Sequence, residues 1–155
     1  MIRPYRPEDL QQLKQITEVC FEGVSIDRNI ERHFGLIAGR DWRWRKVRHI
    51  DEDVAGDRAR GVFVWESDGR VVGYITTRLD RESRLGWIPN IAVLPQFQGH
   101  GVGRRLMEAA LEYMRAEGME CAKIETLEQN AVGSRFYPDV GFREVARQIH
   151  YAMRL

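Results

Sequence analysis

The sequence predicts a mixed α/β fold. Three runs rich in β-branched and aromatic residues have the period of two that is typical of strands, at residues 61–67, 70–79 and 85–94. Asp68-Gly69 joins the first two runs and is a strong hairpin signal. Apolar residues recur instead at helical spacing over residues 7–21 and 104–117, which indicates two amphipathic helices. With the shorter segments described next, the predicted order is β, α, α, β, β, β, loop, α, β, α, β.

The N-terminal third is predicted to be mostly helical. Residues 2–5 can form a short strand, and the proline and two acids at Pro7–Asp9 favour the first turn of a helix that ends near Phe21. A second helix is expected to stop at Gly39, and a third to cover residues 42–54. The apolar positions of the second helix are Ile30, Phe34 and Ile37.

The C-terminal third is predicted to return from helix to strand. Gly118 is expected to stop the second amphipathic helix, and residues 122–127 to form a strand. Asn130 then caps a short helix that reaches Tyr137, where the next residue, a proline, breaks it. Residues 142–155 are predicted to form one or two final strands.

Length and composition favour one globular domain over residues 1–155. The chain is 43% hydrophobic and 30% charged, and no apolar run approaches the length of a bilayer span. The first residues lack a signal-like apolar stretch, and the two cysteines lie far apart, so we expect a cytoplasmic protein. The net charge of +1 argues against nucleic acid or a membrane as partner.

A Gly-rich loop follows the third strand and opens into a helix: Gln98-Gly99-His100-Gly101-Val102-Gly103. Three glycines keep side chains away from the backbone N–H groups, and the positive end of the helix dipole adds to their attraction for an anion. Arg104 and Arg105 supply further positive charge. The loop therefore predicts a site for phosphate groups.

The spacing of the glycines separates the ligands that use such loops. A nucleotide triphosphate loop ends in Gly-Lys-Ser/Thr, whereas Gly103 is followed by two arginines. A dinucleotide fingerprint needs G-x-G-x-x-G, whereas this loop reads G-x-G-x-G. Both classes fail on these residues. A turn that only permits close packing of strand and helix is the remaining structural alternative.

The loop resembles the pattern Gln/Arg-x-x-Gly-x-Gly/Ala of the GNAT superfamily of N-acetyltransferases, at Gln98, Gly101 and Gly103. Residues 91–97 resemble the strand and lead-in of that family. Asn130 and residues 135–142 resemble its second signature, commonly Phe-Tyr, three variable residues and Gly-Phe. The resemblance implies a twisted, mostly antiparallel central sheet of six or seven strands, splayed at the fourth and fifth strands and flanked by about four helices.

The resemblance also implies acetyl-CoA as co-substrate. Backbone groups of Ile91 and Val93 would hold the pantetheine arm, with the Val93 N–H on the thioester oxygen. The residues expected to bind the coenzyme are Ile91, Val93, Gln98, Gly99, His100, Gly101, Val102, Gly103, Arg104, Asn130 and Tyr137. No metal is expected, because the four histidines lack ligand spacing and neither cysteine belongs to a Cys-x-x-Cys pair.

Two side chains are candidates for proton transfer. By resemblance, Tyr137 lies beside the coenzyme sulfur and would protonate the departing thiolate; the alternative is a tyrosine that only packs on the core. Glu125 stands where the ribosomal-protein N-terminal alanine acetyltransferases, which the chain weakly resembles, carry a base. We expect it to be half-buried with a raised pKa, and an ordinary ion-paired strand glutamate is the alternative. Asp80 and Glu82 are weaker candidates.

The acceptor side is less well defined by the sequence. Trp42, Trp87 and Asn90 are the candidate substrate residues. Residues 40–48 interleave arginine with tryptophan, which fits an acidic or aromatic acceptor, or an amphipathic helix with tryptophans inward. The acids at residues 51–53 are predicted to lie on a solvated helix face.

The function predicted from these features is acetyl transfer to a primary amine of a small molecule, peptide or protein. Two other classes stay open: an acyl-CoA sensor without catalysis, and a nucleic-acid-binding module that uses Trp42–Arg48. A homodimer also stays open.

Overall fold

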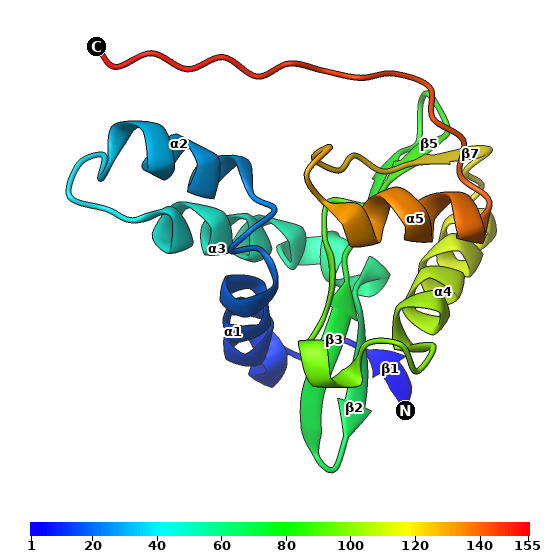
Figure 1. The fold of residues 1–155 in the computed structure, drawn as a ribbon. Coiled ribbons are helices and arrows are strands. Elements are labelled where there is room, and N and C mark those ends of the chain that lie inside the picture. Colours follow the sequence, from blue (N-terminus) through cyan, green and yellow to red (C-terminus); the bar gives the residue numbers. More distant parts are fainter.

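The computed structural model describes residues 1–155, with helices on both sides of a strongly twisted set of strands (Figure 1). The helices are α1 (Leu10–Cys20), α2 (Ile26–Phe34), α3 (Trp42–Asp53), α4 (Val102–Ala116) and α5 (Ala131–Val140). The strands are β1 (Ile2–Pro4), β2 (Phe63–Ser67), β3 (Arg70–Ile75), β4 (Arg78–Asp80), β5 (Leu85–Trp87), β6 (Ile91–Val93) and β7 (Cys121–Lys123).

The strands form two sheets. One has the order β1-β2-β3-β6 and is antiparallel throughout, and the other has the order β4-β5-β7, with β5 and β7 parallel. Helices α1 to α3 lie on one side of the strands and α4 and α5 on the other (Figure 1). The predicted mixed α/β fold is confirmed, and the structure has seven strands where six or seven were expected and five α-helices where about four were expected.

The second and third predicted strands each break in two. Residues 70–79 form β3 and β4, and residues 85–94 form β5 and β6. The break in the latter contains Pro89, which has no N–H for a ladder. Across it the Thr76 N–H donates to the Asn90 carbonyl at 2.9 Å, and the Asn90 N–H donates to the Thr76 hydroxyl at 3.2 Å. The chain changes sheet here, and this change opens the gap between β6 and β7.

Three predicted helix boundaries shift. Helix α2 ends at Gly35, which has a φ of 71°, rather than at Gly39. Helix α4 begins at Val102, two residues earlier than predicted. Helix α5 continues through Pro138 to Val140, because a proline in the last turn removes only its own N–H from the helix. The Asp68-Gly69 hairpin is confirmed, with φ of 50° and 72°.

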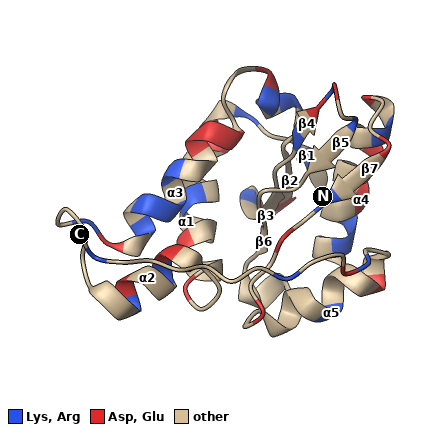
Figure 2. Cartoon of the chain, turned by 90° about the horizontal axis from the view of Figure 1, so that it is seen from above, with Lys and Arg blue, Asp and Glu red and all other residues tan.

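The predicted final strands are wrong. Residues 142–155 form no strand, and after α5 the chain runs as an extended arm towards α2 (Figures 1 and 2). A strand needs a neighbour for its hydrogen bonds, and this segment has none within the chain. No helix of the structure combines the length and apolar character that crossing a membrane requires.

Candidate functional site

The edge of β6 that faces β7 has free backbone donors. On the other edge, Thr76 N–H donates to the Asn90 carbonyl and Leu94 N–H to the Val72 carbonyl, each at 2.9 Å. Antiparallel ladders use alternate residues, so the N–H groups of Ile91 and Val93 point away from β3. Because β7 pairs with β5 and not with β6, these two groups face the gap.

Gln98 fixes the end of this strand to the loop. Its side-chain amide donates to the Val93 carbonyl at 2.8 Å, and its backbone N–H donates to Pro95 O at 3.2 Å. The Cys20 thiol also reaches the Val93 carbonyl, at 3.4 Å. The carbonyl of Val93 is thus held in place on the protein side, while its N–H stays free.

The loop presents six consecutive free donors. No backbone N–H from Gly99 to Arg104 has an acceptor in the protein, and the first helical bond is that of Arg105 N–H to Gly101 O at 3.1 Å. Gly99 and Gly101 have φ of 78° and 81°, a region that only glycine adopts readily. A run of free N–H groups that ends in a helix N-terminus is an anion site.

Helix α5 lies beside this loop and carries Tyr137. Asn130 caps the helix by accepting from Gly133 N–H at 3.0 Å and donates to the Thr126 hydroxyl at 2.9 Å. A Cβ on Gly133 would lie 2.7 Å from the Asn130 amide nitrogen and 3.0 Å from the Tyr137 ring, so the turn requires glycine. Asn130 therefore positions the helix that bears the tyrosine.

The Tyr137 hydroxyl makes no hydrogen bond within the protein. Its ring packs edge-on against Phe136 and Phe142, with centroids 5.5 and 6.2 Å away. Burial raises the pKa of the hydroxyl to about 12, so it keeps its proton at neutral pH. The group is a proton donor without a partner.

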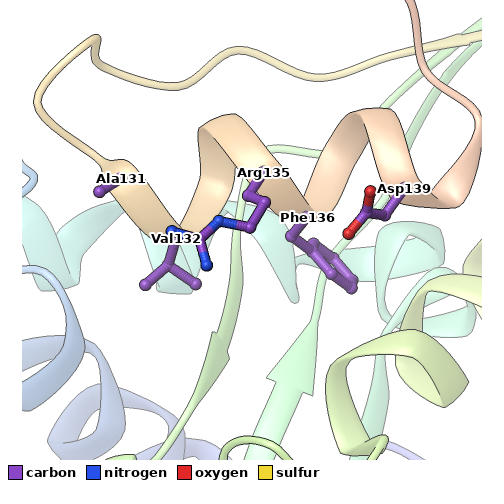
Figure 3. Close-up of a pocket in the computed structure, with 5 residues that line it drawn as sticks. All are labelled: Ala131, Val132, Arg135, Phe136 and Asp139. Carbon is purple, nitrogen blue, oxygen red and sulfur yellow. The ribbon is translucent and has the colours of Figure 1, made fainter.

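A pocket of about 290 Å³ lies against α5. Figure 3 shows its lining side chains on one side of the helix: Ala131, Val132, Arg135, Phe136 and Asp139. The Phe136 ring would lie 3.6 Å from a Cβ on Gly103, so the pocket adjoins the first turn of α4. This proximity places α5 beside the start of the helix that follows the Gly-rich loop.

A second pocket, of about 200 Å³, lies under α3. It is lined by Lys46, His49, Asp53, Arg78, Trp87, Pro89 and Asn90. Asp53 is 0% exposed, which corrects the prediction of a solvated acid: helical spacing places it on the buried stripe of Ile50. Its carboxylate accepts from Arg78 at 2.7 Å, Asn90 at 2.8 Å and Thr76 at 2.9 Å.

Lys46 is the one cation in this pocket without a carboxylate partner. Its ammonium donates to Asn90 Oδ1 at 2.8 Å and lies 4.2 Å from the centre of the Phe21 ring, but forms no ion pair. Burial lowers the pKa of Lys46, with Asp27 and Asp53 acting in the opposite direction. Neither Lys46 nor Asp53 was predicted to be a site residue. Both lie on one helical stripe with Trp42 and Ile50, and this spacing could have indicated that they face the inside of the protein.

Glu125 follows β7 and lies beside this second pocket. Trp87 Nε1 donates to one carboxylate oxygen at 3.0 Å, and Lys123 donates to the other at 3.1 Å. The side chain of Glu125 is 57% exposed, so the expectation of a half-buried carboxylate is wrong: residues 124–127 lie beyond the paired part of β7. Glu125, Trp87 and Asn90 thus lie in one region of the molecule.

Other predicted residues lie elsewhere. Trp42 is 1% exposed and packs inside, so its side chain supports α3 and has no surface for a substrate. Trp44 lies outside, contrary to the inward orientation predicted for an amphipathic helix, with Arg40 and Arg48 stacked on it at 4.4 and 4.5 Å. Asp80 accepts two backbone N–H groups of its own turn. No group of three or more acidic, His or Cys side chains could hold a metal.

Comparison with known proteins identifies the class to which this fold and loop belong. The Acetyltransferase (GNAT) family matches residues 11–142. The chain belongs to that family, as the two signatures predicted.

Three similar proteins differ in what their names describe. Mycothiol acetyltransferase of Streptomyces griseus is 34% identical over 83 residues, 54% of this chain and 27% of that protein. N-alpha-acetyltransferase 30 of Saccharomyces cerevisiae is 25% identical over 152 residues, 95% of this chain and 80% of that protein. Aminoglycoside N-acetyltransferase AAC(6')-Iy, solved in complex with CoA, has a TM-score of 0.68 at 19% identity, covering 100% of both chains. This chain spans about a quarter of the first of these relatives, and the last shows the fold alone.

Proposed function

We propose that residues 1–155 form one catalytic domain that transfers an acetyl group from acetyl-CoA to a primary amine. The observation that carries this proposal is the run of six free N–H groups at Gly99–Arg104 beside the free N–H groups of Ile91 and Val93. The first set suits a pyrophosphate, and the second suits the amides and thioester of a pantetheine arm lying in the gap. CoA in a solved relative supports the same choice.

The residues present can hold this co-substrate. The free N–H groups of Gly99–Arg104 would take the diphosphate end, with Arg104 adding charge, and the β6 edge would take the thioester end. The coenzyme supplies the activated acetyl carbonyl. The chain's own part is to bind it, to orient it with the Val93 N–H on the thioester oxygen, and to move two protons.

The proton steps can be assigned to Glu125 and Tyr137. The amine nitrogen attacks the acetyl carbonyl, the new C–N bond forms and the C–S bond breaks, which leaves an amide and a thiolate. Tyr137, protonated because burial raises its pKa to about 12, gives its proton to the thiolate. Glu125 takes the proton lost by the amine, and its exposed carboxylate favours transfer through water.

The pocket under α3 is proposed as the acceptor site. Trp87 lines this pocket and donates a hydrogen bond to Glu125, so the pocket lies next to that carboxylate. Asn90, which also lines the pocket, immediately precedes β6. The amine belongs to a small molecule, a peptide or a protein, because the similar proteins are named mycothiol acetyltransferase, aminoglycoside N-acetyltransferase and N-alpha-acetyltransferase. Lys46, without an ion-pair partner, favours an acceptor with a negatively charged group near its amine.

The proposal is tested by incubating the chain with acetyl-CoA and a panel of amines, amino acids, aminoglycosides and peptides, and measuring free thiol released. We expect release that depends on one class of acceptor. Binding of acetyl-CoA in calorimetry with no thiol release from any acceptor would indicate the non-catalytic sensor instead. Equal thermal stabilisation by NAD and by acetyl-CoA would overturn the assignment of the loop.

A further inference from the structure

The C-terminal arm, residues 143–155, is an extended segment that pairs with no strand of the protein. It leaves α5 after Gly141 and crosses the molecule until its end lies near α2 (Figures 1 and 2). None of its backbone N–H or C=O groups takes part in a hydrogen bond within the protein. Two polar interactions join its side chains to the rest of the chain, Arg147 with Glu128 and Arg154 with the Phe34 carbonyl.

The arm also has an apolar face that nothing covers. Apolar side chains occupy alternate positions from residue 145 on, with Arg147 as the one exception: Val145, Ile149, Tyr151, Met153 and Leu155. Each of them is at least 78% exposed. The positions between them are polar or alanine. A period of two with one apolar face is the pattern of a strand that packs that face on a core.

The molecule has an open sheet edge that fits such a strand. Strand β7 bonds to β5 on one side, where Lys123 O accepts from Ile88 N–H at 3.0 Å and Cys121 N–H donates to Arg84 O at 3.4 Å. The backbone groups of Ala122 and Ile124 therefore point to the other, unpaired side. Their side chains pack on the core beneath α4 and α5, so a strand added here could extend that core with its apolar face.

We propose that the arm of one copy of this chain pairs with the open edge of β7 in a second copy, and that the exchange is reciprocal. In one copy the arm is directed away from its own β7 and ends beside Phe34, so both the strand and the edge are left free. A twofold pair satisfies both at once, because each copy gives one strand and receives one. Exposed edges and unpaired apolar strands are otherwise sites of aggregation.

The exchange bears on the candidate site. Residues 124–127 continue β7 without a partner and include Glu125. A strand from the second copy would fix this backbone and with it the position of the carboxylate beside Trp87. This consequence rests on the proposed function, whereas the exchange follows from the arm and the edge alone.

The first test is the mass in solution by sedimentation at micromolar concentration. The chain of 18.1 kDa should sediment at twice that mass. Ile149→Lys, which places a charge on the apolar face, should sediment as a monomer, and Gln148→Lys, with the same charge on the polar face, should remain a dimer. A monomeric parent chain, or two variants with the same mass, would overturn the proposal.

The second test locates the strand by disulfide formation with Cys121. Pairing on the core face would place the polar face of the arm on the side of Cys121, since Ala122 and Ile124 point to the core. In a Cys20→Ser background, single cysteines replace Glu144, Ala146, Gln148 and His150 in turn. At least one should give a doubled mass on a non-reducing gel, and Asp139→Cys, on exposed α5 surface, should not. A disulfide within one chain would show that the arm returns to its own sheet, and no disulfide at any position would equally refute the exchange.

Discussion

The coenzyme side and the acceptor side of the candidate site are built from different parts of the chain. The coenzyme side consists of backbone groups in one stretch, from Ile91 to Arg104, with α5 beside it. The acceptor side consists of side chains from three separate stretches, residues 46–53, 76–78 and 87–90, and the carboxylate of Asp53 bonds to the other two stretches. A site made of backbone depends on glycines and helix ends, which a short motif records. A site made of side chains depends on distant contacts, which no motif records.

Gly101→Val is the substitution expected to weaken coenzyme binding most. Its φ of 81° is unfavourable for valine, and a side chain there would obstruct the approach of a phosphate to the loop N–H groups. We expect binding of acetyl-CoA to fall by about a hundredfold or more, by analogy with the lower end of the loss caused by removing one preorganised donor. Calorimetry measures the affinity, and thiol release should fall with it at fixed coenzyme concentration.

Gly118→Val is the matched control for that substitution. Gly118 has φ of 83° at the other end of α4, and a Cβ at either glycine meets nothing within 4 Å. Both variants should therefore lose similar stability, on the order of 1–2 kcal/mol for a left-handed non-glycine residue. If Gly118→Val weakens coenzyme binding as much as Gly101→Val, the loop is not the phosphate site.

This difference also explains what the sequence could predict. The Gly-rich loop, the Asp68-Gly69 hairpin and the cap at Asn130 rest on local backbone chemistry, and all three lie where predicted. The burial of Asp53 and the exposure of Glu125 depend on partners 25 to 38 positions away, Arg78 and Trp87. Charged residues are solvated unless paired, so the sequence alone favoured the wrong environment for Asp53.

The arm is the largest difference between prediction and structure. Its alternating pattern predicted one or two strands, whereas residues 143–155 form an extended segment that belongs to no strand. The pattern carries no information on which edge the strand joins, because hydrogen bonds to a neighbour in the same chain or in another copy need the same alternation.

Tyr137→Phe tests the proposed proton donor. The ring contacts with Phe136 and Phe142 would remain, and only the hydroxyl is lost. We expect kcat to fall by about a hundredfold, within the range for one positioned proton donor, while the affinity for acetyl-CoA stays near that of the parent. Rapid thiol detection under saturating acceptor gives kcat. An unchanged kcat would mean that thiolate release needs no proton from this group.

Glu125→Gln tests the link from the acceptor pocket to the chemistry. Glutamine can still accept from Trp87 Nε1, so the geometry should persist while the proton acceptor is lost. We expect turnover to fall by about a hundredfold near pH 6, the lower end of the range for general base catalysis. The deficit should shrink as the pH approaches the pKa of the free amine, which is about 8 at a peptide N-terminus and above about 10 on lysine.

Glu128→Gln is the control for this pH profile, because Glu128 is 90% exposed and lies near the end of the same segment. It should match the parent at every pH. A Glu125→Gln enzyme with parental rates from pH 6 to 9 would remove Glu125 from the mechanism, and the base would then have to be sought elsewhere in the pocket.

Lys46→Met should have the smallest effect and concerns the acceptor side alone. Burial lowers the pKa of Lys46 in the folded protein. In the unfolded chain a lysine has a pKa of about 10.4, so folding weakens the binding of this proton. A depressed lysine pKa costs stability at all pH values below the folded pKa, and that cost disappears as the pH rises through the unfolded value. Methionine keeps much of the volume and removes the cost, so Lys46→Met should melt a few degrees higher than the parent at pH 7 and approach it near pH 10. Lys14→Met, at an ammonium paired with Asp51 at 2.8 Å, should show no such gain.

In kinetics, Lys46→Met should raise the KM for an acidic acceptor severalfold and leave the KM for acetyl-CoA unchanged. A lower melting temperature at pH 7 with an unchanged acceptor KM would show that Lys46 holds Asn90 in place and does not serve the acceptor.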